Sequence, residues 1–210
     1  MLYKKEDYSS IPYHVMFPHF GMCLHDINSD YAFIPLPRCG SSFLNKYFVS
    51  NYKWTPYNYD FVPEKKFFSI VRDPYKRWLS GLWSIADPWH DDIVNKPYDL
   101  LDDNSLKKLF DNPDCDNHHT MKQNLFYKNI NLNNITFFNF DDPKFIYNIQ
   151  HFIKNVLLLD VKPMDDWHKS DEKTEIKKIV EKDKNNYNKL MNWLEDDYQF
   201  FTKLKFYEAN

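Results

Sequence analysis

An arginine and two serines surround a glycine in residues 36–42, which read Leu-Pro-Arg-Cys-Gly-Ser-Ser. A glycine-containing loop that leads from a strand into a helix points several backbone N–H groups at one spot, where the helix dipole also favours negative charge. Arg38 adds a fixed cationic fork for phosphate or sulfate oxygens, and Ser41 and Ser42 add hydroxyl donors. The pattern predicts an anion-binding loop, although the same residues could form an ordinary turn in which Ser41 caps the helix.

A second arginine lies eight positions before a serine, on the other side of an expected helix start. Arg72 directly follows an apolar run, and α/β sheets place ligands at the carboxyl ends of their strands. Ser80 lies about two turns into the helix that Asp73 is expected to cap, so Arg72 and Ser80 could hold a phosphate group between them. The neighbouring Lys76 and Arg77 are expected on the solvated surface. Together the two motifs indicate an enzyme that binds a doubly phosphorylated nucleotide.

Strand-like runs precede both motifs. Residues 31–34 lead into the first motif, and residues 67–71 form an apolar run broken by one serine, as in a strand buried on both faces of a parallel sheet. A third candidate strand covers residues 135–138. Because these strands alternate with helical periods, the sequence predicts one α/β domain over residues 1–210, with a central, mostly parallel sheet flanked by helices. The stretch 87–119 is interpreted as a variable insertion near the substrate side.

Helical periods and capping residues indicate where the helices begin and end. Pro74 suits the first position of the helix that follows Asp73. Helices are expected in five places: directly after the first motif, from Pro74, over about residues 100–110, from Asp142 to about Asn155, and as one long closing helix that contains Ile176 and Leu194. The Lys- and Glu-rich residues of 171–189 are expected to form the solvated face of that last helix.

Composition limits the class of protein. A chain of 210 residues with 43% hydrophobic and 19% aromatic residues fits one folded domain rather than a disordered chain. The formal net charge of −3 gives no global argument for nucleic acid or an anionic membrane as partner. The three cysteines have no spacing typical of a zinc site or a disulfide framework. Since no signal peptide and no long apolar stretch is present, the sequence predicts a soluble protein in a reducing compartment, with no metal site.

The two motifs resemble those of a known enzyme family. Residues 37–42 resemble the 5′-phosphosulfate loop, P-[KR]-x-G-[ST]-[ST], of sulfotransferases that use 3′-phosphoadenosine 5′-phosphosulfate (PAPS). Residues 71–80, Val-Arg-Asp-Pro-Tyr-Lys-Arg-Trp-Leu-Ser, resemble the 3′-phosphate segment of the same enzymes, which has the same spacing of Arg and Ser. The similarity is closest to the carbohydrate sulfotransferases related to the heparan 2-O, chondroitin and HNK-1 enzymes.

Four later segments extend this resemblance. Residues 119–123 are similar to the H-x-x-x-Q segment of the family, and residues 135–142 to the strand and turn that follow it. Residues 167–170 resemble the loop before the last helix, which the family places near the nucleotide, although Ser170 is also a good helix cap. Asp197-Tyr198, followed by two phenylalanines, resembles the closing D-[YF]-x-x-F.

The resemblance implies a P-loop-like sulfotransferase fold and a PAPS-dependent enzyme. The 5′-phosphosulfate would lie on the loop, and the 3′-phosphate between Arg72 and Ser80, with Lys169 near the nucleotide. Arg38 would stabilise the departing phosphate of the product, adenosine 3′,5′-bisphosphate (PAP). No metal is required, and the acceptor would be a hydroxyl of a glycan, a glycolipid or a small molecule. The loop residues that would bind the cofactor are Arg38, Cys39, Gly40, Ser41 and Ser42.

An acceptor hydroxyl also needs a general base, and several residues remain candidates. The interval between the two motifs has no histidine, so its candidates are the acids Asp60 and Glu64. His119 is the leading histidine because it begins the H-x-x-x-Q segment. The upstream histidines also stay open, namely His14, His19 and His25.

Two other functions are consistent with the sequence. One is a small nucleotide or metabolite kinase with a divergent phosphate loop, although the kinase pattern G-x-x-x-x-G-K-[ST] is not met. The other is a non-catalytic relative that binds a nucleotide or glycan without turnover. Animal relatives in the family are usually anchored in the Golgi membrane, whereas this chain has no anchor-like segment. A cytoplasmic enzyme of bacterial or viral origin is therefore expected.

Overall fold

The computed structural model describes residues 22–58, 64–86, 103–113, 119–127, 130–164 and 173–209. These residues form two compact units. The sheet unit consists of the described residues of 1–70, 130–164 and 205–210, and the helical unit of those of 71–129 and 165–204. No helix of the described part is both long and apolar enough to cross a membrane.

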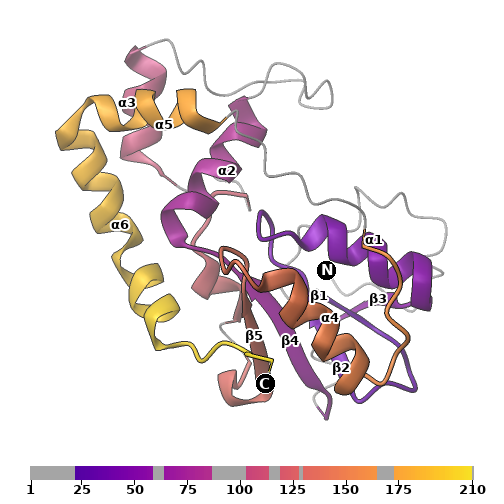
Figure 1. The fold of residues 1–210 in the computed structure, drawn as a ribbon. Helices are drawn as coiled ribbons and strands as arrows, with labels where there is room; N and C mark the ends of the chain where they lie inside the picture. Colours follow the sequence, from indigo (N-terminus) through magenta and orange to yellow (C-terminus); the bar gives the residue numbers. More distant parts are fainter. Residues whose placement is uncertain are drawn as a thin grey trace. The chain divides into compact units, whose positions relative to one another are not determined.

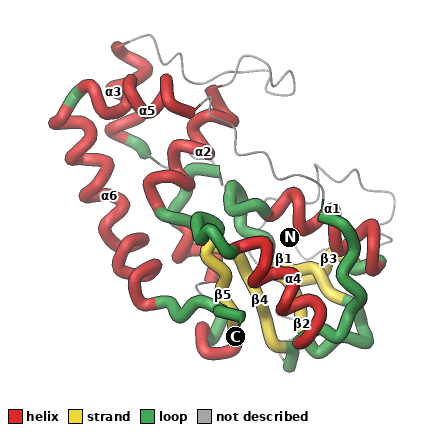
Figure 2. Tube along the Cα trace, in the orientation of Figure 1, coloured by secondary structure: helices red, strands yellow, loops and turns green. Residues whose placement is uncertain are grey.

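The sheet unit contains a five-stranded sheet in the order β3-β1-β2-β4-β5, drawn in yellow in Figure 2. Strand β1 pairs antiparallel with β2 and with β3, whereas β2 and β4 pair in parallel with Ile34 opposite Ser69. The Ser69 hydroxyl donates to the Ile34 carbonyl at 2.7 Å, which explains a serine in this buried strand. The strands are β1 (Met22–His25), β2 (Tyr31–Ile34), β3 (Thr55–Asn58), β4 (Lys66–Val71) and β5 (Ile135–Asn139).

The three predicted strands are confirmed as β2, β4 and β5, but the sheet is mixed rather than mostly parallel. The difference comes from β1 and β3, which the sequence analysis does not predict. Both have only four residues, and β3 contains Pro56. Because β3 lies at the edge of the sheet, one side of its backbone needs no strand partner, and a proline is tolerated there.

Four of the five helix predictions are confirmed. The helix expected over about residues 100–110 is described from Asp103 to Asp111. The helix expected from Asp142 begins later, at Phe145, because Asp142 forms a turn in which its carboxylate accepts the Lys144 N–H at 2.8 Å. The corresponding helices are α1 (Ser41–Tyr52), α2 (Pro74–Ala86), α3 (Asp103–Asp111) and α4 (Phe145–Asn155), and two 3₁₀ helices also occur, η3 (Gln123–Tyr127) and η4 (Leu132–Asn134).

The fifth prediction, one long closing helix, is wrong. The segment forms two helices, α5 (Lys173–Lys182) and α6 (Lys184–Lys203), with a sharp change of direction between them (Figure 1). Asp183 separates them in an extended conformation, with φ −100° and ψ 106°. Its carboxylate accepts the N–H groups of Asn185 at 2.8 Å and Asn186 at 3.3 Å, so it caps α6.

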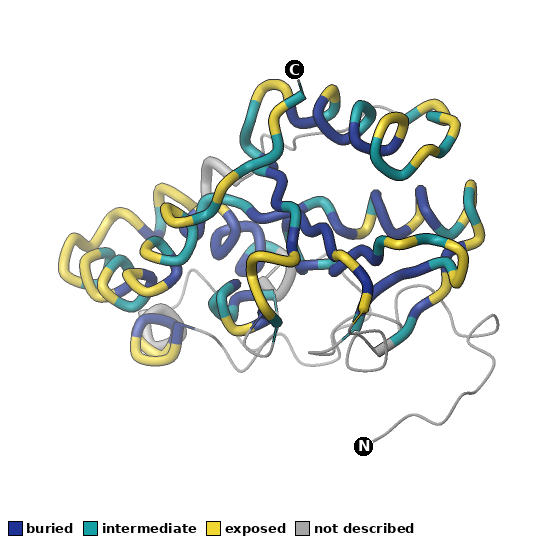
Figure 3. The backbone as a smooth tube through the Cα atoms, turned by 90° about the horizontal axis from the view of Figure 1, so that it is seen from below, coloured by how far each residue is buried: buried dark blue, intermediate teal, exposed yellow. Residues whose placement is uncertain are grey.

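Each unit has its own apolar core. In the sheet unit, Phe68 of β4 packs against Phe48 of α1 and Phe152 of α4, with ring centroids 5.5 and 5.1 Å apart. Figure 3 shows buried and exposed residues alternating along the helices, as expected for helices with one face on a core. The core of the helical unit joins α2, α3, α5 and α6 through Tyr75, Trp78, Leu79, Leu82, Leu109, Phe110, Ile176, Val180, Leu190 and Leu194.

Candidate functional site

The first motif forms a tight turn between β2 and α1. The Cys39 N–H donates to the Leu36 carbonyl at 3.3 Å, which closes a four-residue turn with Pro37 in its second position. Arg38 occupies the third position with φ 65°, in the left-handed region. These features match a type II turn, which usually has glycine at that place. Arginine there costs about 1–2 kcal/mol of backbone strain, and such strain concentrates at functional sites.

A second left-handed residue, Gly40 with φ 79°, follows and is the N-cap of α1. As a glycine, Gly40 cannot cap the helix with a side chain, and Ser41 is already the first residue of α1. The alternative in which Ser41 is the cap is therefore not the one adopted. Turns of this kind and the first N–H groups of a helix form concavities that bind anions. The loop thus has the backbone geometry expected of an anion site.

The side chains of this loop differ in how accessible they are. Cys39 is fully buried, so it can offer a ligand only backbone groups. Ser41 is also buried, whereas Ser42 is exposed. The Nε atom of Arg38 is buried although the residue as a whole is partly exposed. A ligand at this loop would meet backbone N–H groups, the exposed Ser42 side chain and the partly exposed Arg38.

The second motif forms the corner between β4 and α2. Asp73 caps α2 as predicted, because its carboxylate accepts the Lys76 N–H at 2.9 Å. Ser80 lies on α2 and is only 6% exposed. Arg72 directly follows the carboxyl end of β4.

The segment 119–123 crosses this corner. Gln123 is fully buried, and its side chain holds the backbone of Arg72: Nε2 donates to the Arg72 carbonyl at 2.8 Å, and Oε1 accepts the Arg72 N–H at 3.4 Å. The backbone of His119 lies against Gly81, the residue after Ser80. The structure therefore brings His119 and Gln123 to the two ends of the second motif.

Arg77 corrects the expectation that it lies on the solvated surface. Lys76 is exposed as expected, but Arg77 is 1% exposed. Its guanidinium donates to the Met121 carbonyl and lies over the Phe126 ring, 5.6 Å from the centroid. A buried guanidinium needs such partners, since desolvation without them would be costly. Arg77 therefore fixes the 119–127 segment on α2.

Glu64 lies away from the first motif. It lies two residues before Lys66, the first residue of β4, which pairs with Tyr31, whereas the first motif follows the carboxyl end of β2. Six residues of β4 span about 20 Å. His25 lies near the amino end of β2, where it pairs with Ala32, and is therefore also far from the first motif. Burial, with the charge of Lys65, lowers the pKa of His25.

The remaining predicted site residues lie outside the described part of the chain: Asp60, Lys169, His14 and His19. The cap or nucleotide role of Ser170 lies there as well, as does most of the insertion expected over 87–119. Within the described ranges, no group of three or more His, Cys, Asp or Glu side chains could hold a metal ion.

The sequence analysis assigns no role to the amide of Gln123, which holds the backbone of Arg72. A glutamine in a polar stretch has no local signature, and only the H-x-x-x-Q resemblance pointed to it. Comparison of the chain with protein-family models, with curated proteins and with solved structures finds no match. A function for this chain must therefore be inferred from the two motifs and from the local geometry of each.

Proposed function

We propose that this chain is a PAPS-dependent sulfotransferase with a P-loop-like sulfotransferase fold, which transfers a sulfuryl group to a hydroxyl of a carbohydrate or glycolipid. The observation that carries the proposal is the left-handed conformation of Arg38, two residues before the N-cap of α1. A glycine would relieve the strain at this position, and an arginine adds a cationic fork for sulfate or phosphate oxygens. The residues of this loop are also those that resemble the phosphosulfate loop of the family.

The second motif supports a ligand with two anionic ends. Arg72 and Ser80 match the family's 3′-phosphate segment, and the corner that carries them is held by a capping aspartate and by Gln123. An arginine on a fixed backbone loses less conformational freedom when it binds a phosphate. Adenosine 3′,5′-bisphosphate carries two phosphate groups, and each of the two arginines could bind one of them.

Arg38 and the backbone N–H groups at the start of α1 would assist the sulfuryl transfer. PAPS supplies an activated sulfuryl group: a bond forms between the acceptor oxygen and sulfur, and the bond from sulfur to the 5′-phosphate oxygen breaks. Arg38 and the N–H groups at the start of α1 would stabilise the negative charge on the leaving phosphate. Arginine keeps its proton, so its part is charge stabilisation rather than proton transfer.

His119 is the best candidate for the base that takes the acceptor proton. Its backbone lies against Gly81, next to Ser80, whereas Glu64 lies before the amino end of β4, away from the first motif. A histidine has a pKa suited to accepting a proton near neutral pH. We expect His119→Ala to abolish sulfate transfer and to leave the affinity for PAP within a factor of about two.

The first test is calorimetric binding of PAP without metal, compared with ATP. The wild-type protein should prefer PAP, and Arg38→Ala and Arg72→Ala should each weaken binding by at least about ten-fold, because each removes a charged hydrogen-bonding partner. Lys46→Ala on α1 and Lys76→Ala on α2 are the matched controls, since both lysines are exposed cations near the motifs. These controls should retain wild-type affinity.

Other outcomes would favour the alternative functions or end the proposal. Preference for ATP with magnesium would indicate the kinase. Binding of PAP without transfer of labelled sulfate from PAPS to a panel of glycan acceptors would indicate the non-catalytic relative. Absence of PAP binding by a folded wild-type protein, judged by circular dichroism and a cooperative thermal transition, would overturn the proposal.

A further inference from the structure

Two consecutive residues of α6 support the corner between β4 and α2, Asp197 indirectly through η3 and Tyr198 by a direct contact with Asp73. Both carboxylate oxygens of Asp197 accept backbone N–H groups of η3, from Gln123 at 2.9 Å and from Asn124 at 2.8 Å. The Gln123 side chain in turn holds the backbone of Arg72. The hydroxyl of the next residue, Tyr198, lies 3.4 Å from the nearer carboxylate oxygen of Asp73.

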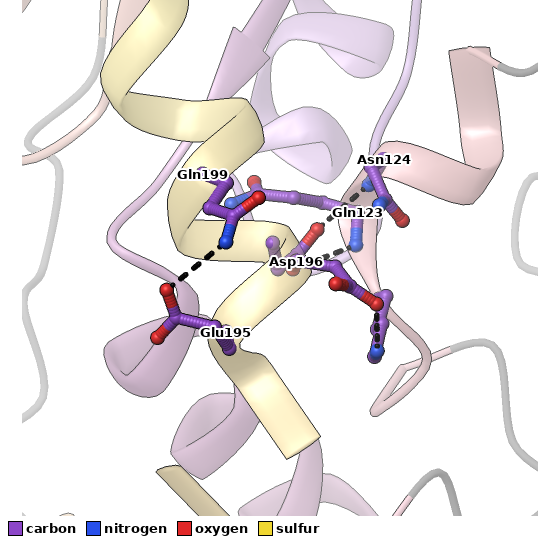
Figure 4. A network of polar contacts seen from close by, with 7 residues as sticks. Gln123, Asn124, Glu195, Asp196 and Gln199 are labelled. Carbon is purple, nitrogen blue, oxygen red and sulfur yellow. Dashed lines mark hydrogen bonds and ion pairs between the residues drawn. The ribbon is translucent and has the colours of Figure 1, made fainter. Parts of the chain in front are cut away.

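The surroundings of Asp197 fix its role. The residue is 1% exposed, and burial raises the pKa of its carboxyl, while the two N–H groups and the nearby charges of Arg77 and Lys122 oppose that effect. Figure 4 shows Gln123 and Asn124 facing the stretch of α6 that carries Glu195, Asp196 and Gln199. A carboxylate with both oxygens engaged by adjacent N–H groups fixes the start of η3 against α6.

The orientation of the Gln123 amide is equally constrained. Its oxygen faces an N–H group and its nitrogen faces a carbonyl, so the reversed orientation would place donor against donor and acceptor against acceptor. This pair of bonds acts on the backbone of Arg72 as a neighbouring strand would, one residue beyond the end of β4. The direction of the arginine side chain depends on that backbone.

We propose that Asp197 and Gln123 are positioning residues that hold Arg72 in the conformation required to bind an anionic group of the ligand. Neither needs to touch the ligand. This inference rests on the proposed function for the identity of the ligand, the bisphosphate, but the positioning itself is a property of the protein alone. A site group that is fixed by a second layer of hydrogen bonds binds more tightly than one that must be ordered on binding.

The experiment is a double-mutant cycle read by PAP affinity. Asp197→Asn replaces one carboxylate oxygen, which accepts an N–H, by an NH2 group, which cannot accept one. Gln123→Glu replaces the NH2 group that donates to the Arg72 carbonyl by an oxygen that cannot donate. Each change should weaken PAP binding about ten-fold in the wild-type background and leave it unchanged in Arg72→Ala, because the arginine to be positioned is then absent. Asp196→Asn is the matched control, since Asp196 is exposed and pairs with Lys122 at 2.9 Å. It should bind PAP as the wild type does.

A second measurement needs no ligand. Hydrogen exchange at the Arg72 amide, followed by NMR, should be faster in Asp197→Asn and Gln123→Glu than in the wild type and Asp196→Asn. If the wild-type protein binds no PAP, this measurement alone decides the positioning, so failure of the proposed function is distinguishable from failure of this inference. Equal weakening of PAP binding in both backgrounds, or unchanged exchange at Arg72 in a folded Asp197→Asn protein, would overturn the inference.

Discussion

No side chain fits between Gly81 and His119. A Cβ atom on Gly81 would lie 2.1 Å from the His119 carbonyl oxygen and 2.6 Å from its carbonyl carbon. Both contacts are with backbone, which cannot rotate away as the end of a flexible side chain could. Helix α2 therefore has a glycine in its interior for close approach of the 119–123 segment, although glycine is a poor helix former.

Gly81→Ala should destabilise the protein. In an ordinary exposed helix, alanine in place of glycine stabilises by about 0.8–1 kcal/mol. Here we expect the opposite sign, a loss of about 1–3 kcal/mol in the free energy of unfolding, because the segment must move away from α2. Urea unfolding measures the change. Asn188→Ala, at an exposed position of α6, is the control and should be neutral or slightly stabilising. A stabilised Gly81→Ala protein would contradict the close contact.

Arg77 and Lys76 are adjacent in sequence but should respond very differently to the same substitution. Arg77→Met leaves the Met121 carbonyl without its guanidinium partner and removes a cation close to the buried Asp197, so we expect a loss of about 3 kcal/mol or more in the free energy of unfolding. Lys76→Met, at an exposed site, should change it by less than about 0.5 kcal/mol. Chemical denaturation of both proteins tests this, and equal effects would refute the burial of Arg77.

The burial of Arg77 also illustrates what the sequence could not predict. Local signals were sufficient for β2, for β4 and for the start of α2, because apolar runs and the pair Asp73-Pro74 act within a few residues. The partners of Arg77 lie on η3 and in the segment before it, more than 40 positions along the chain. A lone arginine on a helix is usually exposed, so only the tertiary contacts reveal its burial.

The candidate site was predicted in the same uneven way. The loop residues and the corner at Arg72 were found because their motifs are contiguous in sequence. The contacts that connect Arg72 to Gln123 and then to α6 join segments 51 and 74 residues apart, so no local pattern contains them. Glu64 was a candidate base by its place between the motifs in sequence, and only the register of β2 and β4 shows that it lies before the amino end of β4, away from the first motif.

Cys23 provides a prediction of pH dependence. The residue is fully buried in β1, and burial raises the pKa of its thiol to about 12, with Lys65 opposing the effect. A raised pKa in the folded state means that the folded protein prefers the protonated thiol. This preference costs no stability below the ordinary thiol pKa, and stability is then lost as the pH rises from that value towards 12.

Iodoacetamide labelling at pH 8.5, read by peptide mass spectrometry, should therefore be much slower at Cys23 in the native protein than in the same protein unfolded in guanidinium. Glutathione is the reference for a free thiol. Above pH 9, the free energy of unfolding should fall more steeply in the wild type than in Cys23→Ala, which has no thiol to titrate there. Rapid native labelling, or equal slopes in the two proteins, would show that the thiol is accessible.

Asp183 decides whether the C-terminal segment is one helix or two. The apolar positions Val180 and Tyr187 are separated by seven residues, about two turns, so the hydrophobic pattern continues in phase across the break and predicts a single helix. The carboxylate of Asp183 opposes this by capping α6. Asp183→Ala should lower the free energy of unfolding by about 1 kcal/mol, since it removes the cap and favours a continuous helix. Asp183→Ser, which keeps an N-cap oxygen, should restore most of the loss in thermal unfolding. If alanine is as stable as aspartate, the core packing of α5 and α6 alone maintains the break.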